Sequence, residues 1–200
     1  MEIFNSSKTF IIAEIGLNHN GSVQLAEKSI IEAAKSGADA VKFQTFIPEL
    51  FVSPEQTDRM ERMKQFQLTF AEFESLSKTA KTEGIEFFST PLDLESAKFL
   101  NSIQNVFKIA SGDNNFWPLI DLVLSFDKPL IVSTGLATLK EVQKIHTRVQ
   151  TQNRLENREL WFAMLHCVSA YPVPAADANL SAISTLVKEF PGTLIGYSDH

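Results

Sequence analysis

Residues 25–44 read LAEKSIIEAAKSGADAVKFQ, and this stretch sets the pattern for the whole chain. Its first half has apolar residues at helical spacing, and those expected on one face of the helix are Leu25, Ala26, Ile30, Ala33 and Ala34. Gly37 follows, in the place of the left-handed residue that ends such a helix. The apolar run Ala40–Phe43 then has the character of a buried strand. The sequence therefore predicts a helix followed directly by a short buried strand.

The same alternation of strand and helix continues along the chain. Short runs rich in Ile, Val and Phe are expected as seven strands: Phe10–Ile15, Ala40–Phe43, Ile85–Phe88, Val106–Ile109, Leu130–Val132, Leu160–Leu165 and Leu194–Ile195. Strands that alternate with helices pair in parallel through right-handed crossovers. The predicted class is therefore α/β, either a closed TIM (β/α)8-type barrel or an open doubly wound sheet.

Local signals mark where several helices begin and end. Gly84 is expected to end a helix as Gly37 does, and Thr138 with Glu141 has the spacing of a capping box that opens a helix after the fifth strand. Three polar stretches are predicted to be loops rather than domain linkers: 48–58, 151–158 and 172–179. The chain is therefore expected to form one domain.

Composition excludes several classes of protein. The 200 residues carry 18 Lys plus Arg against 24 Asp plus Glu, a net charge of −6, so no global basic field attracts nucleic acid or an anionic membrane. No apolar run approaches the ~20 residues that span a bilayer, and Glu14 interrupts the apolar run at the N-terminus. Cys167 is the only cysteine, so no internal disulfide forms. We expect a cytoplasmic protein that binds neither nucleic acid nor membrane.

Charged and hydroxyl side chains lie where the expected strands end. These residues are Glu14, Lys42, Gln44, Ser89, Thr90, Lys108, Ser111, Ser133, Thr134, His166, Ser198 and His200. Both candidate folds bind ligands at the carboxyl ends of their strands. The strand ends are therefore the expected site.

Two lysines point to an anionic ligand. Lys42 and Gln44 are two apart and share one face of a strand, while Val41 and Phe43 share the other. An ammonium among core residues needs a negative partner, either an anion that it binds or a carboxylate on a neighbouring strand. Lys108 repeats the pattern next to Ser111, and two such lysines with nearby hydroxyls suit a small, multiply charged phosphate or carboxylate.

The remaining polar residues leave alternatives open. Glu14 lies in a buried strand and either pairs with a lysine or handles a proton. His166 is expected to be a structural histidine with its hydrogen bonds satisfied, His146 a surface residue, and Cys167 a buried thiol rather than a nucleophile. Residues 18–21 are expected to form a loop and turn, with a substrate contact left open. Dinucleotide-binding, Walker and nucleophile-elbow motifs are absent from the sequence.

Seven motifs together resemble the N-terminal half of the sialic acid (N-acetylneuraminate) synthase family. They are residues 12–21 (IAEIGLNHNG), 37–45 (GADAVKFQT), 88–91 (FSTP), 107–113 (FKIASGD), 133–135 (STG), 166–172 (HCVSAYP) and 196–200 (GYSDH). The resemblance implies a TIM-type barrel, with about seven strand–helix units in this chain. It also implies an N-acetylneuraminate synthase-like transferase, which condenses phosphoenolpyruvate with an N-acetylmannosamine-like sugar and water. The products would be phosphate and a sialic-acid-type nonulosonate.

The same resemblance implies roles for individual residues. The residues matched to phosphoenolpyruvate binding are Lys42, Thr90, Lys108, Ser111 and Ser198. Those matched to sugar binding are Gln44 and Tyr171, and the matched carboxylates are Glu14 and Asp113, either of which would activate the attacking water. His200 is matched to a ligand of a divalent metal, Mn²⁺ or Mg²⁺.

The resemblance also sets expectations about what the 200 residues contain. They are expected to hold the synthase barrel domain up to strand 7, without the eighth unit, the second metal histidine and the small C-terminal antifreeze-like domain. In the full-length homodimer that domain supplies an arginine to the partner's site. The free 200-residue chain is therefore expected to be neither a stable monomer nor active.

Two hypotheses about function remain open at this point. The chain is part of a synthase, or it is a catalytically incompetent barrel remnant that binds anions or pairs with another chain. The acceptor sugar also stays open. Synthases of legionaminic, pseudaminic and spore-coat sugars share these motifs, and Ser169 stands where some members carry Asn.

Overall fold

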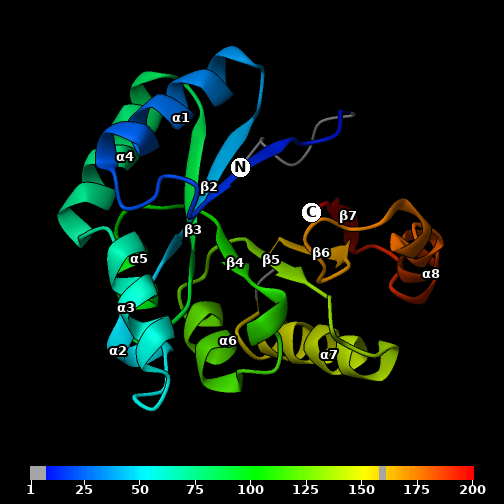
Figure 1. The fold of residues 1–200 in the computed structure, drawn as a ribbon. Coiled ribbons are helices and arrows are strands. Elements are labelled where there is room, and N and C mark those ends of the chain that lie inside the picture. Colours follow the sequence, from blue (N-terminus) through cyan, green and yellow to red (C-terminus); the bar gives the residue numbers. More distant parts are fainter. Residues whose placement is uncertain (1–7, 158–160) are drawn as a thin grey trace. The chain divides into compact units, whose positions relative to one another are not determined.

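The computed structural model describes residues 8–157 and 161–200 in two compact units, residues 1–105 and 106–200 (Figure 1). The first unit holds a parallel three-stranded sheet in the order β1 (Ile12–Gly16), β2 (Ala40–Thr45), β3 (Glu86–Pro91). The second holds a parallel four-stranded sheet in the order β4 (Phe107–Ile109), β5 (Leu130–Ser133), β6 (Phe162–Cys167), β7 (Leu194–Ser198). All seven expected strands are confirmed with small shifts of their ends; Leu160, the first residue of the expected sixth strand, lies outside the described residues.

Helices follow the strands in both units. Those of the first unit are α1 (Val23–Lys35), α2 (Pro48–Phe51), α3 (Thr57–Phe66), α4 (Phe70–Thr82) and α5 (Leu94–Leu100). Those of the second are α6 (Trp117–Leu124), α7 (Leu139–Leu155) and α8 (Ser181–Glu189), with short 3-10 turns η2 (Ser111–Asp113) and η3 (Ala175–Asp177). In the described part of the chain no helix is long and apolar enough to cross a membrane.

The first helix shows why this alternation forms. Ser22 caps α1 by accepting the backbone N–H of Leu25, and Gly37 ends it with φ +83°. Its buried face is made by Ala26, Ile30 and Ala33. The expectation that Leu25 lies on this face is wrong, since Leu25 is 40% exposed. Only a narrow arc of the helix contacts its neighbours, and Leu25 lies one step around the helix from that arc.

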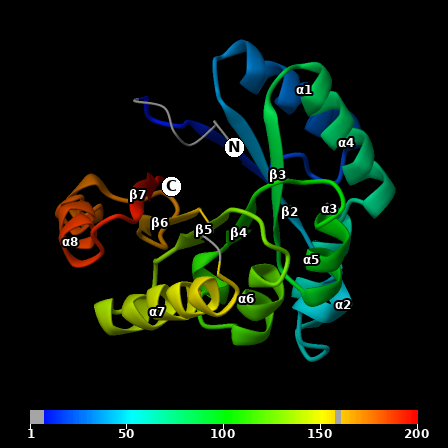
Figure 2. The same ribbon diagram turned by 180° about the vertical axis from the view of Figure 1, so that it is seen from behind.

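A core cluster in the first unit joins the helices to one face of the sheet. Helices α1 and α4 pack against each other and lie side by side in both views (Figures 1 and 2). Beneath them lie Val41, Phe43 and Phe87 of the sheet, with Phe73 of α4 meeting Phe43 edge-on at 6.3 Å. These buried side chains occupy the helix-facing side of β2 and β3. The opposite side is left for Lys42 and the other alternate residues.

Two of the predicted loops are partly helical. The stretch 48–58 forms α2, which Pro48 opens at its first turn, and the beginning of α3. The stretch 151–158 continues α7 to Leu155, while Arg158 lies outside the described residues. Both segments resemble loops in sequence because they are polar. In α7, however, Val149 and Asn153 extend the row of buried residues at i, i+4 spacing, and this row continues the helix. The predicted capping box at Thr138 and the predicted helix end at Gly84, which has φ +72°, are confirmed.

His146 is not the surface residue that was expected. It lies half-buried on α7 between the rings of Phe162 and Phe190, at 6.2 and 4.9 Å. Its Nε2 is 3.1 Å from Thr193 Oγ1, and burial lowers the pKa of the imidazole. His146 therefore helps to pack α7 against β6, the strand that follows it, and against the C-terminal end of α8.

Candidate active site

In the first unit, one face of the sheet gathers polar and charged residues of three strands. The parallel register places Glu14 of β1 beside Lys42 of β2, and Gln44 beside Thr90 of β3. Lys42 Nζ lies 2.8 Å from Glu14 Oε2 and donates to Thr90 Oγ1 at 2.9 Å and to the Phe43 carbonyl at 3.4 Å. Lys42 is 7% exposed. The carboxylate partner that the sequence left as an alternative is therefore present.

The exposure of Glu14 distinguishes it from Lys42. Its side chain is 44% exposed, whereas that of Lys42 is 9% exposed. The backbone of Gly16, with φ +54°, passes close to both Glu14 and Gln44: a methyl group at Gly16 would lie 3.1 Å from Glu14 Oε1 and 3.8 Å from Gln44 Nε2. Glu14 is thus fixed by Lys42 on one side and accessible to water on the other.

Ser89, one of the strand-end candidates, lies on the other face of β3. Its hydroxyl is 2.7 Å from Thr45 Oγ1, and its backbone N–H donates to Gln104 Oε1. These groups are buried, and neighbouring protein groups satisfy them. Ser89 therefore fixes β3 in place, while Thr90 faces Lys42.

Residues 18–21 form the expected turn after β1. Asn20 and Gly21 both have positive φ, and a methyl group at Gly21 would lie 2.1 Å from the carbonyl oxygen of Gln65. His19 is fully buried, and its Nδ1 accepts the backbone N–H of Gly21. Burial lowers the pKa of His19 against the opposing effect of Glu72. A neutral His19 therefore holds the turn from inside.

In the second unit, Lys108 repeats the arrangement of Lys42. It is 5% exposed, and its Nζ donates to Ser133 Oγ at 2.5 Å and to the Ile109 carbonyl at 3.2 Å. Burial raises the pKa of Asp113, and the nearby Lys108 only partly opposes this shift. An ammonium, a hydroxyl and a carboxyl group of raised pKa therefore lie near the ends of β4 and β5.

Ser111 lies next to the single cysteine. Its Oγ is 2.9 Å from Cys167 Sγ, and Cys167 is 5% exposed, which confirms the expected buried thiol. Gly135 fits closely against both, since a methyl group there would lie 2.6 Å from Cys167 Sγ and 2.7 Å from Ser111 Oγ. Ser198 of β7 pairs in register with Cys167 and is half-buried. Ser111, Cys167 and Gly135 thus form one tightly packed group.

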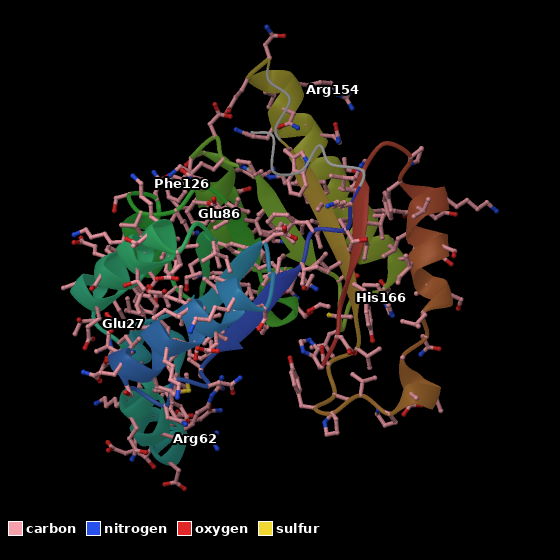
Figure 3. The ribbon with its side chains drawn as sticks, turned by 90° about the horizontal axis from the view of Figure 1, so that it is seen from above. Glu27, Arg62, Glu86, Phe126, Arg154 and His166 are labelled. Atoms are coloured by element: carbon pink, nitrogen blue, oxygen red, sulfur yellow. The ribbon has the colours of Figure 1, made fainter. Side chains whose placement is uncertain are left out.

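His166 lies on the opposite face of β6 from Cys167. It stacks on Tyr197 of β7 at 5.7 Å, and Figure 3 labels it close to that strand. Its Nε2 lies 2.8 Å from the carbonyl oxygen of Ala178 and must donate the proton, since a carbonyl only accepts. The expectation that His166 is a structural histidine is therefore confirmed, and its side chain lies on the other face of the sheet from Lys108.

Tyr171 and His200 meet at the end of β7. Their rings lie 4.3 Å apart, and Tyr171 Oη is 3.4 Å from His200 Nε2, while Tyr171 is 75% exposed. Among residues 8–157 and 161–200, no three His, Cys, Asp or Glu side chains come together as metal ligands. The described residues therefore form no complete metal site around His200, and its role as a ligand stays a prediction.

Asn114 is the contributor that the sequence did not single out. It is 7% exposed, and its Nδ2 donates to the carbonyl of Gly135 at 3.0 Å and to that of Ser133 at 3.4 Å. It follows Ser111-Gly112-Asp113 directly, and an amide after a predicted strand end was the available signal. Its partners are backbone carbonyls 19 and 21 residues away, which no local pattern reveals.

The described residues form about seven strand–helix units of parallel strands, with charged residues at the carboxyl ends of the strands. This arrangement is typical of the TIM-barrel class. The chain belongs to the NeuB family, whose model matches residues 29–200. This confirms the family resemblance predicted from the sequence motifs.

Relatives and solved structures agree with this assignment. An uncharacterized protein of Methanocaldococcus jannaschii is 43% identical, with 96% of this chain and 55% of that protein covered. The N,N'-diacetyllegionaminic acid synthase of Legionella pneumophila is 39% identical, with 98% and 58% covered. The crystal structure of a sialic acid synthetase from Leptospira borgpetersenii, in complex with citrate, superposes with a TM-score of 0.90 at 35% identity, covering 97% of this chain and 66% of that one. The chain thus spans a little over half the length of the curated relatives it matches.

Proposed function

We propose that this protein condenses phosphoenolpyruvate with an N-acetylmannosamine-like amino sugar and water, giving a nonulosonate and phosphate. The observation that carries the proposal is the pair of buried lysines, Lys42 and Lys108, each held beside a hydroxyl at a strand end. Relatives named as synthases of legionaminic acid and of sialic acid support it. Residues 1–200 would form the barrel domain of this synthase.

Phosphoenolpyruvate carries a carboxylate and a phosphate, and a buried lysine beside a hydroxyl, found once in each unit, suits either group. A buried ammonium oriented by a fixed hydroxyl binds an anion strongly, because little water competes. Ser111 and Ser198 would add hydroxyl donors, and Thr90 would orient Lys42. Gln44 and the exposed Tyr171 are the proposed contacts to the sugar.

The reaction balances without a redox step. The methylene carbon of phosphoenolpyruvate bonds to the aldehyde carbon of the open-chain sugar, whose oxygen takes up a proton. Water then adds to the carbon that bears the phosphate, and the new hydroxyl becomes the keto C=O as the bond from that carbon to the phosphate oxygen breaks. The two protons that the water oxygen gives up balance the proton taken up by the sugar oxygen and the one taken up by the leaving phosphate. Asp113, with its raised pKa, suits the group that gains and releases a proton, and Glu14 is the second candidate because it stays accessible beside Lys42.

A divalent metal, Mn²⁺ or Mg²⁺, is part of the proposal through the family resemblance alone. His200 is its proposed ligand, but the described residues do not complete a site around it. We therefore assign no step of the reaction to the metal. A homodimer of the full-length protein rests on the same resemblance, and the free thiol of Cys167 supports the proposed cytoplasmic location.

A specific observation favours the alternative of a catalytically incompetent barrel remnant. Glu14, Thr90 and the Phe43 carbonyl already surround the ammonium of Lys42, so its burial is accounted for without any ligand. The two hypotheses differ in what happens when phosphoenolpyruvate is supplied. A synthase binds it through the lysines and consumes it, whereas the remnant consumes none.

The test is phosphate release by the full-length protein with phosphoenolpyruvate, Mn²⁺ and a panel of sugars. The panel contains N-acetylmannosamine, its 6-phosphate and 2,4-diacetamido hexoses. Sugar-dependent release that Lys108→Ala abolishes and the exposed control Lys140→Ala leaves unchanged supports the proposal. Absence of release with every sugar, in protein that is folded by circular dichroism, contradicts it.

A further inference from the structure

The turn that follows β5 is held in a conformation that its own residues do not favour. Leu136 has φ +64°, in the left-handed region that residues other than glycine rarely adopt. Its side chain is 81% exposed, so packing of the leucine does not stabilise this conformation. Thr134 donates to the Leu165 carbonyl and the Ala137 N–H donates to the Thr134 carbonyl; these bonds hold the turn in part, and a further buried group adds to that support.

The buried amide of Asn114 supplies that further support. Its Nδ2 donates to the carbonyls of Ser133 and Gly135, at 3.4 and 3.0 Å, and so spans the start of the turn. One side chain thereby fixes two points of the backbone that are two residues apart. Both bonds are buried, where solvent competes weakly.

The two residues fixed by Asn114 contact two of the three proposed anion-binding residues of the second unit, Lys108 and Ser111. The Ser133 hydroxyl accepts from Lys108 Nζ at 2.5 Å. Gly135 packs against Ser111 so closely that a methyl group there would come within 2.7 Å of Ser111 Oγ. The amide therefore acts on the lysine through Ser133 and on the serine through Gly135.

We propose that Asn114 is a positioning residue for the phosphoenolpyruvate site, holding the turn so that Lys108 and Ser111 present their ammonium and hydroxyl together. This inference rests on the proposed function. Asn114 itself is not proposed to contact the substrate. Its effect is expected on phosphoenolpyruvate more than on the sugar, because the residues it fixes lie against Lys108 and Ser111, which are proposed to bind phosphoenolpyruvate.

The structure contains a reporter of the turn that is independent of catalysis. Cys167 is buried against the same turn, 2.9 Å from Ser111 Oγ, and is the only cysteine in the sequence. If Asn114 holds the turn, its removal exposes this thiol. The rate at which a maleimide labels the Cys167 thiol therefore reports how firmly Asn114 holds the turn.

The experiment compares Asn114→Ala with Asn115→Ala, a matched change at the exposed neighbouring asparagine, in the full-length protein. Any cysteine beyond residue 200 is replaced by serine. We expect Asn114→Ala to raise the KM for phosphoenolpyruvate about 10-fold, the effect of losing one well-placed polar interaction. The KM for the sugar should change less, and the labelling of Cys167 should accelerate. Asn115→Ala should match the wild type in all three measurements.

A second variant covers the case in which Asn114→Ala folds poorly. Gly135→Ala leaves the amide in place but inserts a methyl group against Ser111, Cys167 and Ser169, so it should also raise the phosphoenolpyruvate KM. A double-mutant cycle with Ser133→Ala should show non-additive effects, since Asn114 acts partly through Ser133.

The outcomes separate the inference from the function on which it rests. If the wild type neither binds nor consumes phosphoenolpyruvate, the proposed function fails. If the wild type is active, but Asn114→Ala keeps its phosphoenolpyruvate KM and its slow thiol labelling, the positioning role of Asn114 is wrong. Equal rises in both KM values would also refute the inference, because they would indicate a general loss of structure.

Discussion

The replacement Lys42→Met separates the two explanations of the buried lysine. Methionine keeps most of the length of the side chain but removes the ammonium. The variant therefore loses the contacts to Glu14 at 2.8 Å and Thr90 at 2.9 Å. It also loses any contact to an anionic ligand.

The expected effect on stability is small. Removing one partner of a fully buried ion pair costs several kcal/mol, because the other charge is left without solvent. Glu14, however, is 44% exposed on its side chain and regains water when Lys42 is lost. A partly exposed pair contributes about 0–1 kcal/mol, so the free energy of unfolding should change by about 1 kcal/mol or less.

The expected effect on ligand binding is larger. A hydrogen bond to a charged group contributes roughly 1.5–3 kcal/mol, which corresponds to about 10- to 150-fold in affinity. Calorimetric titration of the full-length protein with phosphoenolpyruvate and urea unfolding of the same preparation measure the two effects. Unchanged affinity together with a loss of several kcal/mol in stability would refute the reasoning and leave Lys42 as a structural residue. Lys140→Met, at an exposed lysine, is the matched control and should change neither quantity.

Three further predictions test other parts of the structure. Asp113→Asn should raise the free energy of unfolding near neutral pH, because burial raises the pKa of Asp113 and disfavours its ionised form in the folded chain. This gain in stability should fall as the pH drops below the raised pKa. Urea unfolding that shows a gain growing toward acid pH would contradict this prediction. Ile30→Ala should cost about 2–5 kcal/mol at this fully buried position, while Leu25→Ala should cost much less, and equal losses in thermal melts would place Leu25 in the core after all. His200→Ala should lower the Mn²⁺-stimulated rate of the full-length protein, with only partial recovery at high Mn²⁺, and identical Mn²⁺ titrations of variant and wild type would remove His200 from the proposed metal site.

The strands and the faces of their residues were predictable because they follow from local alternation. Val41 and Phe43 had to face one way and Lys42 the other, whichever sheet formed. The identity of Lys42's partner was not predictable. It depends on the register that places Glu14 of β1 beside Lys42 of β2, and register is set by the whole sheet rather than by either strand.

The wrong predictions concern residues whose polarity does not match their burial in the folded chain. Leu25 is apolar and has the right spacing, yet it is exposed, because only a narrow arc of α1 meets its neighbours. Residues 151–155 are polar and were predicted as loop, yet they extend α7 because Asn153 continues its buried row. Asn114 was missed for a related reason, since its role depends on two carbonyls that only the folded chain brings near.

The most direct test of the proposed reaction follows the bridging oxygen of phosphoenolpyruvate. In the proposed reaction water adds to carbon, and the bond between that carbon and the bridging oxygen breaks, so an ¹⁸O label at the bridge must leave with phosphate. Incubation of the full-length protein with labelled phosphoenolpyruvate, Mn²⁺ and the amino sugar, followed by phosphorus NMR, reads the position of the label. The expected product is phosphate that forms only when sugar is present and that carries the label. Phosphate released without sugar, or without the label, would contradict the proposed reaction.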